Sequence, residues 1–343
     1  MQPSLSSLNT AAPDASEEEQ LHLLSVDDVR LPLADRLAES LELTPEDALL
    51  TVDHLIRAEQ AGKHDHGLIR VPYLINSSRF GGYQFCPAPR PVFESPGRIH
   101  VDGRGHLGYP VLDRFIDEGC DQAVGHGICA GTSRSVYPSG ALFDWAWKAA
   151  ERGVGIILVS TSPARVTSPG GRSPVVGTNP VCIGLPTTPI PFISDTATSE
   201  INHGELLLAR ATGETLPPNA AIGPDGRPAS NPSLVDPARG LGALLPVGGS
   251  HKSFAIAMGV EMLVSMGGLT PGSTVAEEHG VFCIFLGPQL MGNLSAGSEW
   301  VQELSKTGTR IPGWHSWRHA KRRREQGVVE LRTGALEKIT ELL

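Results

Sequence analysis

His66 and Arg70, a histidine and an arginine four residues apart, are the residues whose types and spacing most directly indicate chemistry. Both fall in a short segment that starts near Asp65 and stops before Pro72, since proline disfavours helical geometry in the preceding residue. In a helix the two side chains lie on one face, where an imidazole and a guanidinium can converge on one carboxylate. The spacing predicts a pocket for a small anionic substrate; the alternative is an exposed helix with two unrelated polar residues.

Two glycine patterns resemble nucleotide-binding loops without matching them. Gly103, Gly105 and Gly108 spell GxGxxG, but no clean strand ending in an acidic residue follows at the expected distance. An ordinary tight turn is therefore preferred to a Rossmann loop. Gly248 and Gly249 enter a predicted helix without the Gly-Lys pair of a phosphate loop, so they either help Lys252 to hold a phosphate or serve only packing.

Other signatures of chemistry are weak or missing. His64, Asp65 and His66 have no second cluster at ligand spacing and HExxH is absent, so no metal site is predicted. No GxSxG elbow of a serine hydrolase is present. The basic and aromatic segment from Trp314 to Arg324 fits a solvated helix face, a nucleic-acid surface or a grip on a nucleotide phosphate.

Composition narrows the class of protein. The formal net charge of −9 at pH 7 would repel nucleic acid and anionic membranes, so neither is expected as a partner. The five cysteines lack CxxC spacing, and residues 1–20 lack the pattern of a signal peptide, which predicts a cytoplasmic protein. The apolar run from Phe254 to Val264 is too short to span a bilayer and is interpreted as a buried helix.

The elements that must position these residues follow an α/β pattern. Thr44 and Pro45 mark the start of one helix by their capping and first-turn preferences. Strand and helix patterns alternate from Arg98 to Val159. Beyond that point strands and loops dominate, including Leu206 to Arg210, so repeated βαβ units are not expected. The sequence is expected to close with a strand at 281–285, a basic segment and an amphipathic helix.

Several short segments, taken together and in order, resemble the malate/L-lactate dehydrogenase family of the non-Rossmann type, from about Val26 to Leu343. Each segment is weak alone, but the ordered set is specific. The segments are Asp65-His66-Gly67 with Arg70, Gly170-Gly171, Gly177-Thr178-Asn179-Pro180, Asp195-Thr196-Ala197-Thr198-Ser199, Leu216-Pro217, Asp225-Gly226, Gly248-Gly249 with Lys252, and Pro312-Gly313.

The resemblance implies an architecture. It implies an α/β fold with a mainly antiparallel cofactor-domain sheet and a helical domain built from both ends of the sequence. The expected division is a flexible arm over residues 1–24, a helical substrate domain over 25–150 plus 290–343, and a cofactor domain over 151–289. A homodimer is expected.

The resemblance also implies an activity, the reduction of a small 2-oxo acid or cyclic imino acid by NADH or NADPH, or oxidation of the 2-hydroxy acid. Arg70 would hold the substrate carboxylate, and His66, oriented by Asp195, or Tyr137 would handle the proton. The residues expected at the cofactor are Thr161, Gly170, Gly171, Thr178, Asn179, Asp195, Thr196, Ala197, Lys252, Gly313 and Trp314.

Three departures from the family pattern keep other functions open. Tyr137-Pro138 stands where many relatives have a histidine, Glu205 where a lysine is common, and Ser253 where a glycine follows the lysine. A phenol can donate a proton but is a weak base near neutral pH. One alternative is non-redox chemistry on a small anion, such as isomerisation, cyclisation or elimination; another is a non-catalytic binding protein.

Overall fold

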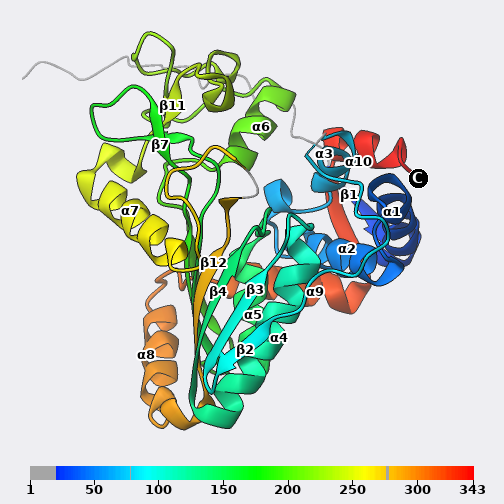
Figure 1. Ribbon diagram of the computed structural model, residues 1–343, viewed down its shortest axis with the longest axis vertical. Helices are drawn as coiled ribbons and strands as arrows, with labels where there is room; N and C mark the ends of the chain where they lie inside the picture. Colours follow the sequence, from blue (N-terminus) through cyan, green and yellow to red (C-terminus); the bar gives the residue numbers. More distant parts are fainter. Residues whose placement is uncertain (1–20, 78, 276–277) are drawn as a thin grey trace, which may run out of the picture.

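The computed structural model describes residues 21–77, 79–275 and 278–343 (Figure 1). Most of the arm expected over residues 1–24 lies outside the described residues. Its last part is not an arm, because Leu21–Ser25 forms strand β1, which pairs antiparallel with β13 (Val328–Arg332). Backbone hydrogen bonds to β13 therefore order residues 21–25. The polar residues that precede them had suggested an irregular segment.

The centre of the described structure is a seven-stranded sheet of order β2-β3-β4-β12-β5-β8-β9. Only β3 and β4 run parallel; every other neighbouring pair is antiparallel, which confirms the expected mainly antiparallel sheet. Because the sheet joins strands from both sides of residue 150, the expected domain boundary falls within it. The strands are β2 (Val92–Ser95), β3 (Arg98–Asp102), β4 (Ile128–Arg134), β5 (Gly155–Ser160), β8 (Val181–Leu185), β9 (Phe192–Thr196) and β12 (Val281–Leu286).

Helices cover both faces of this sheet. Helices α4 (Gly108–His126) and α5 (Leu142–Glu151) pack on one face, while α7 (His251–Ser265) and α8 (Leu294–Lys306) lie on the other (Figure 1). The alternation predicted between Arg98 and Val159 is confirmed. The main core lies between the sheet and α4 and α5, where Phe115 and Phe285 are fully buried and their rings lie 5.8 Å apart.

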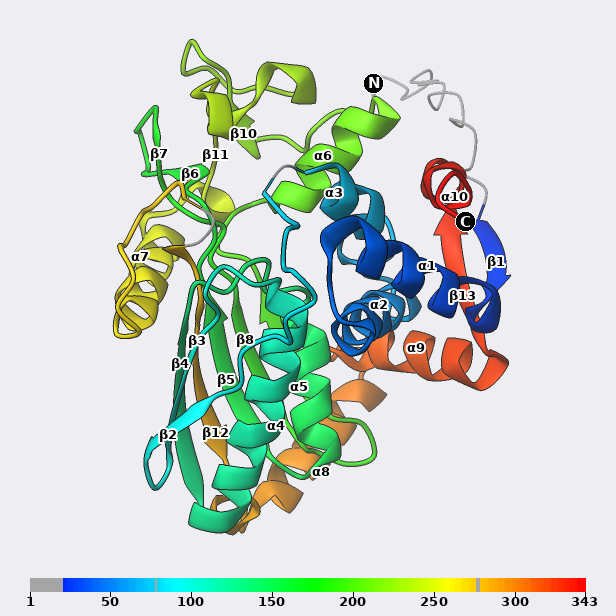
Figure 2. The same cartoon turned by 45° about the vertical axis from the view of Figure 1, so that its right-hand side comes forward.

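A helical unit stands beside the sheet, and it combines residues 21–76 with residues 314–340 (Figure 2). Its elements are α1 (Val26–Leu41), α2 (Pro45–Gln60), α3 (Arg70–Asn76), α9 (Trp314–Gln326), α10 (Thr333–Thr340) and the β1–β13 pair. The start predicted for α2 is confirmed: Thr44 caps it by accepting a hydrogen bond from the Asp47 N–H at 3.2 Å, and Pro45 is its first residue.

A smaller four-stranded sheet adjoins the carboxyl end of β5. It contains β10 (Ala221–Ile222), β11 (Ala243–Leu244), β6 (Val166–Thr167) and β7 (Pro174–Val176), and α6 (His203–Thr212) packs in its hydrophobic cluster. The strand-and-loop expectation for Leu206 to Arg210 was wrong, since these residues are helical. A capping box between Asn202 and Glu205 starts α6, and leucine is a good helix former.

Helix α7 corrects a second expectation. The run from Phe254 to Val264 is helical, but only one side of it is buried, where Val260 and Val264 pack on the sheet. Its other side is apolar and exposed, with Met262 at 64% and Met266 at 66%. None of the helices in the described ranges has the length and apolar character needed to cross a membrane.

Candidate functional site

His66 and Arg70 belong to two elements rather than to one helix. His66 ends a short 3₁₀ helix, η1 (His64–His66), and Arg70 begins α3. The expected helix was to end before Pro72, but Pro72 lies in the first turn of α3. Proline is tolerated there because the backbone N–H groups of the first turn make no hydrogen bond within the helix. Both residues contact Asp65: the Arg70 Nε–H donates to the Asp65 carbonyl at 2.6 Å, and His66 Nδ1 lies 2.7 Å from the Asp65 carboxylate.

Asp65 organises the imidazole of His66. Its Oδ2 lies 2.7 Å from His66 Nδ1 and accepts a hydrogen bond from Asn202 Nδ2 at 2.8 Å. Burial opposes ionisation of Asp65, but the charges and hydrogen bonds of His66, Arg70 and Asn202 outweigh it and hold the pKa of that carboxyl well below its usual range. No described residue bonds His66 Nε2, so this atom is available to a substrate.

Asp195 has a different partner from the one expected. Its Oδ2 accepts the backbone N–H of Phe143 at 3.0 Å, so it anchors the first turn of α5 rather than bonding the ring of His66. Burial raises the pKa of Asp195, against the lowering effect of the charges on Lys63 and His66. The carboxylate therefore lies near His66, but Asp65 supplies the orienting contact.

Arg70 packs closely against neighbouring residues and forms no ion pair with a described carboxylate. Its guanidinium lies 5.7 Å from the ring centroid of Tyr73. A Cβ on Gly204, at the start of α6, would come within 2.6 Å of Arg70 Nη2, so only glycine permits this approach. A guanidinium that makes no ion pair in the described chain is suited to receive a carboxylate from a ligand.

A cavity of about 520 Å³ opens behind this pair, between α3, α6 and α10. Asp65, Arg70, Tyr73 and Gly204 line it, whereas His66 does not. The cavity therefore reaches Arg70 and Asp65, the two residues that flank His66 in the turn.

Tyr137 joins the site through a series of aromatic contacts. Its ring centroid lies 6.4 Å from that of Phe80, which in turn lies 6.0 Å from the ring of Tyr73. On its other side, Tyr137 lies 6.1 Å from the ring of His279. The structure thus brings a histidine from just before β12 to the place where the sequence has lost one.

His279 is buried and incompletely bonded. Its Nδ1 lies 3.3 Å from the Thr161 hydroxyl, while its Nε2 has no hydrogen-bond partner. Burial, followed by the charges of Arg165 and Arg79, lowers the pKa of His279 to about 3, so its ring is neutral at physiological pH. Sequence reasoning missed it because no motif surrounds it.

The glycines of the GxGxxG pattern form a turn between β3 and α4, which confirms the preferred interpretation. A Cβ on Gly103 would lie 2.3 Å from the Ser135 carbonyl, and one on Gly108 would lie 2.2 Å from that of Pro138. These two glycines therefore let the turn pack against the loop that carries Tyr137.

The residues expected at a cofactor gather partly at one end of the sheet. Strand register aligns Val159, Val181 and Thr196, which places Thr161, Thr178 and Ala197 just beyond the same edge. The Thr198 N–H donates to the Thr178 carbonyl at 3.0 Å and closes this edge.

Two further segments adjoin β9. The Ser253 hydroxyl donates to the Thr198 carbonyl at 2.6 Å, which sets the first turn of α7, with Lys252, against this end of the sheet. Gly313, at the start of α9, packs against Ile193 of β9 and places Trp314 beside the strand.

Three of these residues carry side-chain donors. Trp314 Nε1 is buried without an acceptor, and exposed Lys252 forms no ion pair with a described carboxylate. The exposed Thr196 hydroxyl and Lys252 ammonium are of the kind that binds phosphate groups, whereas the indole N–H of Trp314 is not accessible in this structure. The glycine pair contributes less, because the Gly248 N–H already donates to Glu200 at 2.8 Å.

Other expected cofactor residues have internal contacts. Asn179 is fully buried, and its amide donates to the Ala257 carbonyl and to Glu261, which ties the loop before β8 to α7. Gly170 and Gly171 lie in the connection between β6 and β7, where the Gly171 N–H donates to the Ser168 carbonyl at 2.8 Å. In this structure the Asn179 side chain is inaccessible to a cofactor.

Glu205 has a structural explanation. It occupies the third position of α6, where its carboxylate accepts the Asn202 N–H at 2.7 Å and its own N–H donates to Asn202 at 2.9 Å. Because Asn202 also bonds Asp65, the cap steadies the group that orients His66. The acidic residue is therefore not in itself a sign of lost cofactor binding.

The basic segment of α9 makes contacts within the chain in the last turn of the helix. Arg323 pairs with Glu330, and the guanidinium of Arg324 lies 4.1 Å from the ring centroid of Trp147. Among the described residues no group of three histidine, cysteine or acidic side chains is placed to hold a metal ion.

Known proteins match this chain in sequence and in structure. Residues 28–340 match the family described as malate/L-lactate dehydrogenase. A Delta(1)-pyrroline-2-carboxylate reductase of Ancylobacter novellus is 32% identical over 89% of this chain and 93% of its own length. An L-sulfolactate dehydrogenase of Methanothermobacter thermautotrophicus is 27% identical over 88% and 90%.

The crystal structure of delta1-piperideine-2-carboxylate reductase from Pseudomonas syringae pv. tomato superposes with a TM-score of 0.82, at 26% identity, over 94% of this chain and all of that one. The match extends across the helical unit and the sheet that carry the site. The chain belongs to the malate/L-lactate dehydrogenase family, whose members are dehydrogenases and reductases acting on CH–OH and C=N groups.

Proposed function

We propose that the protein is an NADH- or NADPH-dependent reductase of a small 2-oxo acid or cyclic imino acid, which also oxidises the corresponding 2-hydroxy acid. The observation that carries the proposal is the Asp65–His66 pair beside Arg70, an oriented imidazole next to a guanidinium that has no ion-pair partner in the described chain. The names of the relatives, which are reductases of cyclic imino acids and dehydrogenases of hydroxy acids, support the same reaction class.

Arg70, His66 and Asp65 have separate roles in the proposed reaction. When bound, reduced nicotinamide supplies a hydride to the carbonyl or imine carbon. Arg70 binds the substrate carboxylate, and His66 gives a proton from Nε2 to the carbonyl oxygen or imine nitrogen. The carboxylate of Asp65 lies 2.7 Å from Nδ1 and orients the imidazole for this transfer.

Tyr137 and the cofactor residues complete this arrangement. Tyr137, which contacts the rings of Phe80 and His279, is the second candidate to donate a hydrogen bond to the reacting group. Thr196, Lys252 and Trp314 would hold the cofactor at the end of β9. His66 is the proposed proton donor, because Asp65 orients its imidazole and no described residue bonds its Nε2.

The test combines binding with turnover. Calorimetry on the purified protein should detect NADH or NADPH, and absorbance at the nicotinamide band should follow reduction of pyruvate, oxaloacetate or Δ1-pyrroline-2-carboxylate. Arg70→Ala should lower kcat/KM for the turned-over acid by at least about tenfold, the value of a charged hydrogen bond. Arg36→Ala, an exposed surface arginine of α1, is the matched control. No measurable affinity for either nucleotide would contradict the proposal.

We also propose a homodimer. The exposed apolar side of α7 supports this, since large apolar patches on isolated chains commonly mark contact surfaces. Light scattering should give twice the mass of one chain, and a single-chain mass at micromolar concentration would contradict it.

A further inference from the structure

The beginning of helix α6 contacts the turn of residues 64–70, which carries His66 and Arg70. Helix α6 belongs to the small four-stranded sheet, because Leu206 lies in the hydrophobic cluster of that sheet. The 64–70 turn belongs to the helical unit, and α6 lies next to α3 in both views (Figures 1 and 2). Two residues, Asn202 and Gly204, make the contacts between these two parts of the fold.

Asn202 uses both ends of its amide group. Its Oδ1 accepts the Glu205 N–H at 2.9 Å and caps α6, while its Nδ2 donates to Asp65 Oδ2 at 2.8 Å. The same oxygen of Asp65 lies 2.7 Å from His66 Nδ1. Aspartate and serine cap helices equally well, but aspartate has no donor for a carboxylate and the serine side chain is shorter. Asparagine therefore does more at this position than begin a helix.

Gly204 leaves the space that the guanidinium of Arg70 occupies. A Cβ on Gly204 would lie 2.6 Å from Arg70 Nη2, 3.0 Å from Asn202 Oδ1 and 3.1 Å from the Asp65 carbonyl oxygen. Gly204 is not one of the glycines with positive φ, so it is needed for space and not for backbone conformation. Because Nη2 ends a flexible side chain, an added methyl group should displace the guanidinium and leave α6 folded.

The backbone of the 64–70 turn has its own supports. Glu59 of α2 accepts the Leu68 N–H at 2.8 Å and contacts His64 Nδ1. The Asp65 carbonyl accepts the Arg70 Nε–H at 2.6 Å. These contacts lie within the helical unit and do not involve α6. The contacts from α6 therefore act on the side chains of the turn, while its backbone is held from the other side.

We propose that the first turn of α6 positions the two groups of the site separately: Asn202 orients His66 through Asp65, and Gly204 places Arg70. Both are positioning residues, since neither contacts the substrate in this scheme. The inference rests on the proposed function and adds that the site is aligned by a helix of the small sheet. Proton transfer and carboxylate binding are different events, so the two residues should affect different kinetic constants.

The first test replaces Asn202. Asn202→Ser and Asn202→Asp both keep a capping oxygen but lose the hydrogen bond to Asp65, and the aspartate adds a like charge beside it. With saturating NADH or NADPH, kcat for the reduced acid should fall about tenfold in Asn202→Ser and further in Asn202→Asp, with KM within about twofold. An unchanged kcat in both variants would overturn the role of Asn202.

A matched control exists for this change. Asn231 is an exposed asparagine that caps the short helix η2 (Pro232–Leu234) by accepting the Ser233 N–H at 2.9 Å. Asn231→Ser also keeps a capping oxygen and should leave kcat and KM within about twofold of the unmodified protein. An equal fall in kcat in Asn231→Ser and Asn202→Ser would mean that the effect comes from capping in general, against the inference.

The second test replaces Gly204. Gly204→Ala should raise KM for the same acid at least about tenfold and leave kcat within about twofold, because the guanidinium of Arg70 is displaced. Its urea midpoint should not fall, since alanine is a better helix former than glycine. Gly125→Ala, in α4, where a Cβ would meet nothing within 4 Å, is the control. An unchanged KM in Gly204→Ala would overturn the role of Gly204.

A third test does not depend on turnover. Calorimetry with oxamate, an unreactive isostere of pyruvate, should show binding that is lost in Arg70→Ala, about tenfold weaker in Gly204→Ala, and unchanged in Asn202→Ser. The ring ¹⁵N resonances of His66 should shift in Asn202→Ser and not in Asn231→Ser. A loss of oxamate binding together with a lower urea midpoint in every variant of Asn202 and Gly204 would indicate a structural role and overturn the inference.

The outcomes separate this inference from the proposed function. If no oxo or imino acid is reduced but the oxamate and ¹⁵N results follow the expected pattern, the proposed function fails and the positioning by α6 stands. If an acid is reduced while Asn202→Ser and Gly204→Ala change neither kinetic constant, the proposed function stands and the inference fails.

Discussion

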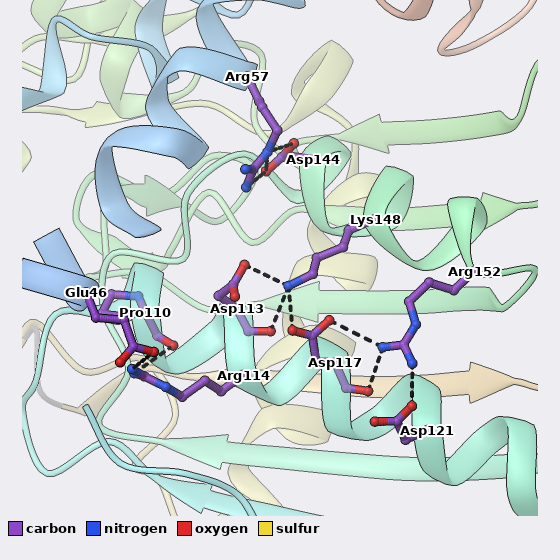
Figure 3. A network of polar contacts seen from close by, with 10 residues as sticks. All are labelled: Glu46, Arg57, Pro110, Asp113, Arg114, Asp117, Asp121, Asp144, Lys148 and Arg152. Carbon is purple, nitrogen blue, oxygen red and sulfur yellow. Dashed lines mark hydrogen bonds and ion pairs between the residues drawn. The ribbon is translucent and has the colours of Figure 1, made fainter. Parts of the chain in front are cut away.

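Charges in the helical layer over the sheet are matched within the chain, whereas charges at the site are not. Between α4 and α5, Lys148 lies 2.8 Å from both Asp113 and Asp117, and Arg152 pairs with Asp117 and Asp121 (Figure 3). Arg70 and Arg165, by contrast, have no ion-pair partner among the described residues. The difference is that the helical layer pairs its cations with carboxylates of the described chain, while these two guanidinium groups do not form such pairs.

A second network of charged residues lies where α5 begins. Asp144 accepts hydrogen bonds from Arg57 and lies 2.9 Å from His54 Nδ1, and the His54 Nε2 accepts the Ala141 N–H at 3.0 Å. Burial opposes its ionisation, but Arg57 and His54 hold the pKa of Asp144 well below its usual range. The network fixes the start of α5, next to the Tyr137 loop.

The largest expected effect comes from breaking this pairing. Asp144→Ala should lower the free energy of unfolding by about 3 kcal/mol, because it leaves a half-buried Arg57 and a fully buried His54 imidazole without their carboxylate. Urea denaturation measures the change. Asp121→Asn, which removes a largely exposed partner of Arg152, should cost no more than about 1 kcal/mol. Equal decreases in the free energy of unfolding for the two variants would contradict the expected difference between buried and exposed ion pairs.

The second largest effect is expected for His279, which tests the charges of the site rather than those of the helical layer. Its pKa falls from an ordinary 6.5 to about 3 on folding. Below pH 6.5 His279 is therefore protonated in the unfolded chain but neutral in the native chain. The free energy of unfolding decreases as the pH falls toward 3. Between pH 6.5 and 5 the loss should be about 1.5–2 kcal/mol.

His279→Gln should remove that component of the pH dependence. Urea midpoints measured at both pH values give the difference between the two proteins. An identical acid loss in the variant would mean that His279 takes up a proton normally in the native state, and that the cations around it are balanced by other groups.

The smallest effect concerns Glu205. Glu205→Ala removes half of the capping box of α6 and should cost about 0.5–1 kcal/mol, while Glu205→Gln, which can still accept the Asn202 N–H, should cost less. Thermal unfolding measures both. Glu205→Gln should also leave the affinity for NADH and NADPH within about twofold. A tighter cofactor complex in this variant would show that the carboxylate repels a phosphate.

Local signals predicted the elements better than they predicted the site. Thr44 and Pro45 determine the start of α2 by contacts within one turn, and strand patterns located β5 and β12 for the same local reason. The helix at Leu206 was missed although Asn202 and Glu205 carry a capping signal. The prediction of a single helix around His66 was wrong, because the segment divides into a 3₁₀ helix and α3. The Asp65 carbonyl accepts the Arg70 side chain at this division.

The partners of the catalytic groups depend on contacts that no spacing reveals. His279 lies far along the chain from Tyr137 and meets it only because β12 pairs with β4, whose following loop carries the tyrosine. The orienting role of Asp65 was assigned to Asp195 by resemblance, and only the geometry separated the two.

The pairing of β1 with β13 has a consequence for how the protein is made. Leu21 lies opposite Arg332, and Val329 and Leu331 belong to the same hydrophobic cluster as Leu37 and Val52 of the first helices. At about 5–20 residues per second, a ribosome needs roughly 15–60 s to travel the distance between these strands. Helices α1 and α2 are therefore synthesised early but finish packing last, after the sheet has emerged. During that interval their apolar faces are the surfaces that a chaperone would meet.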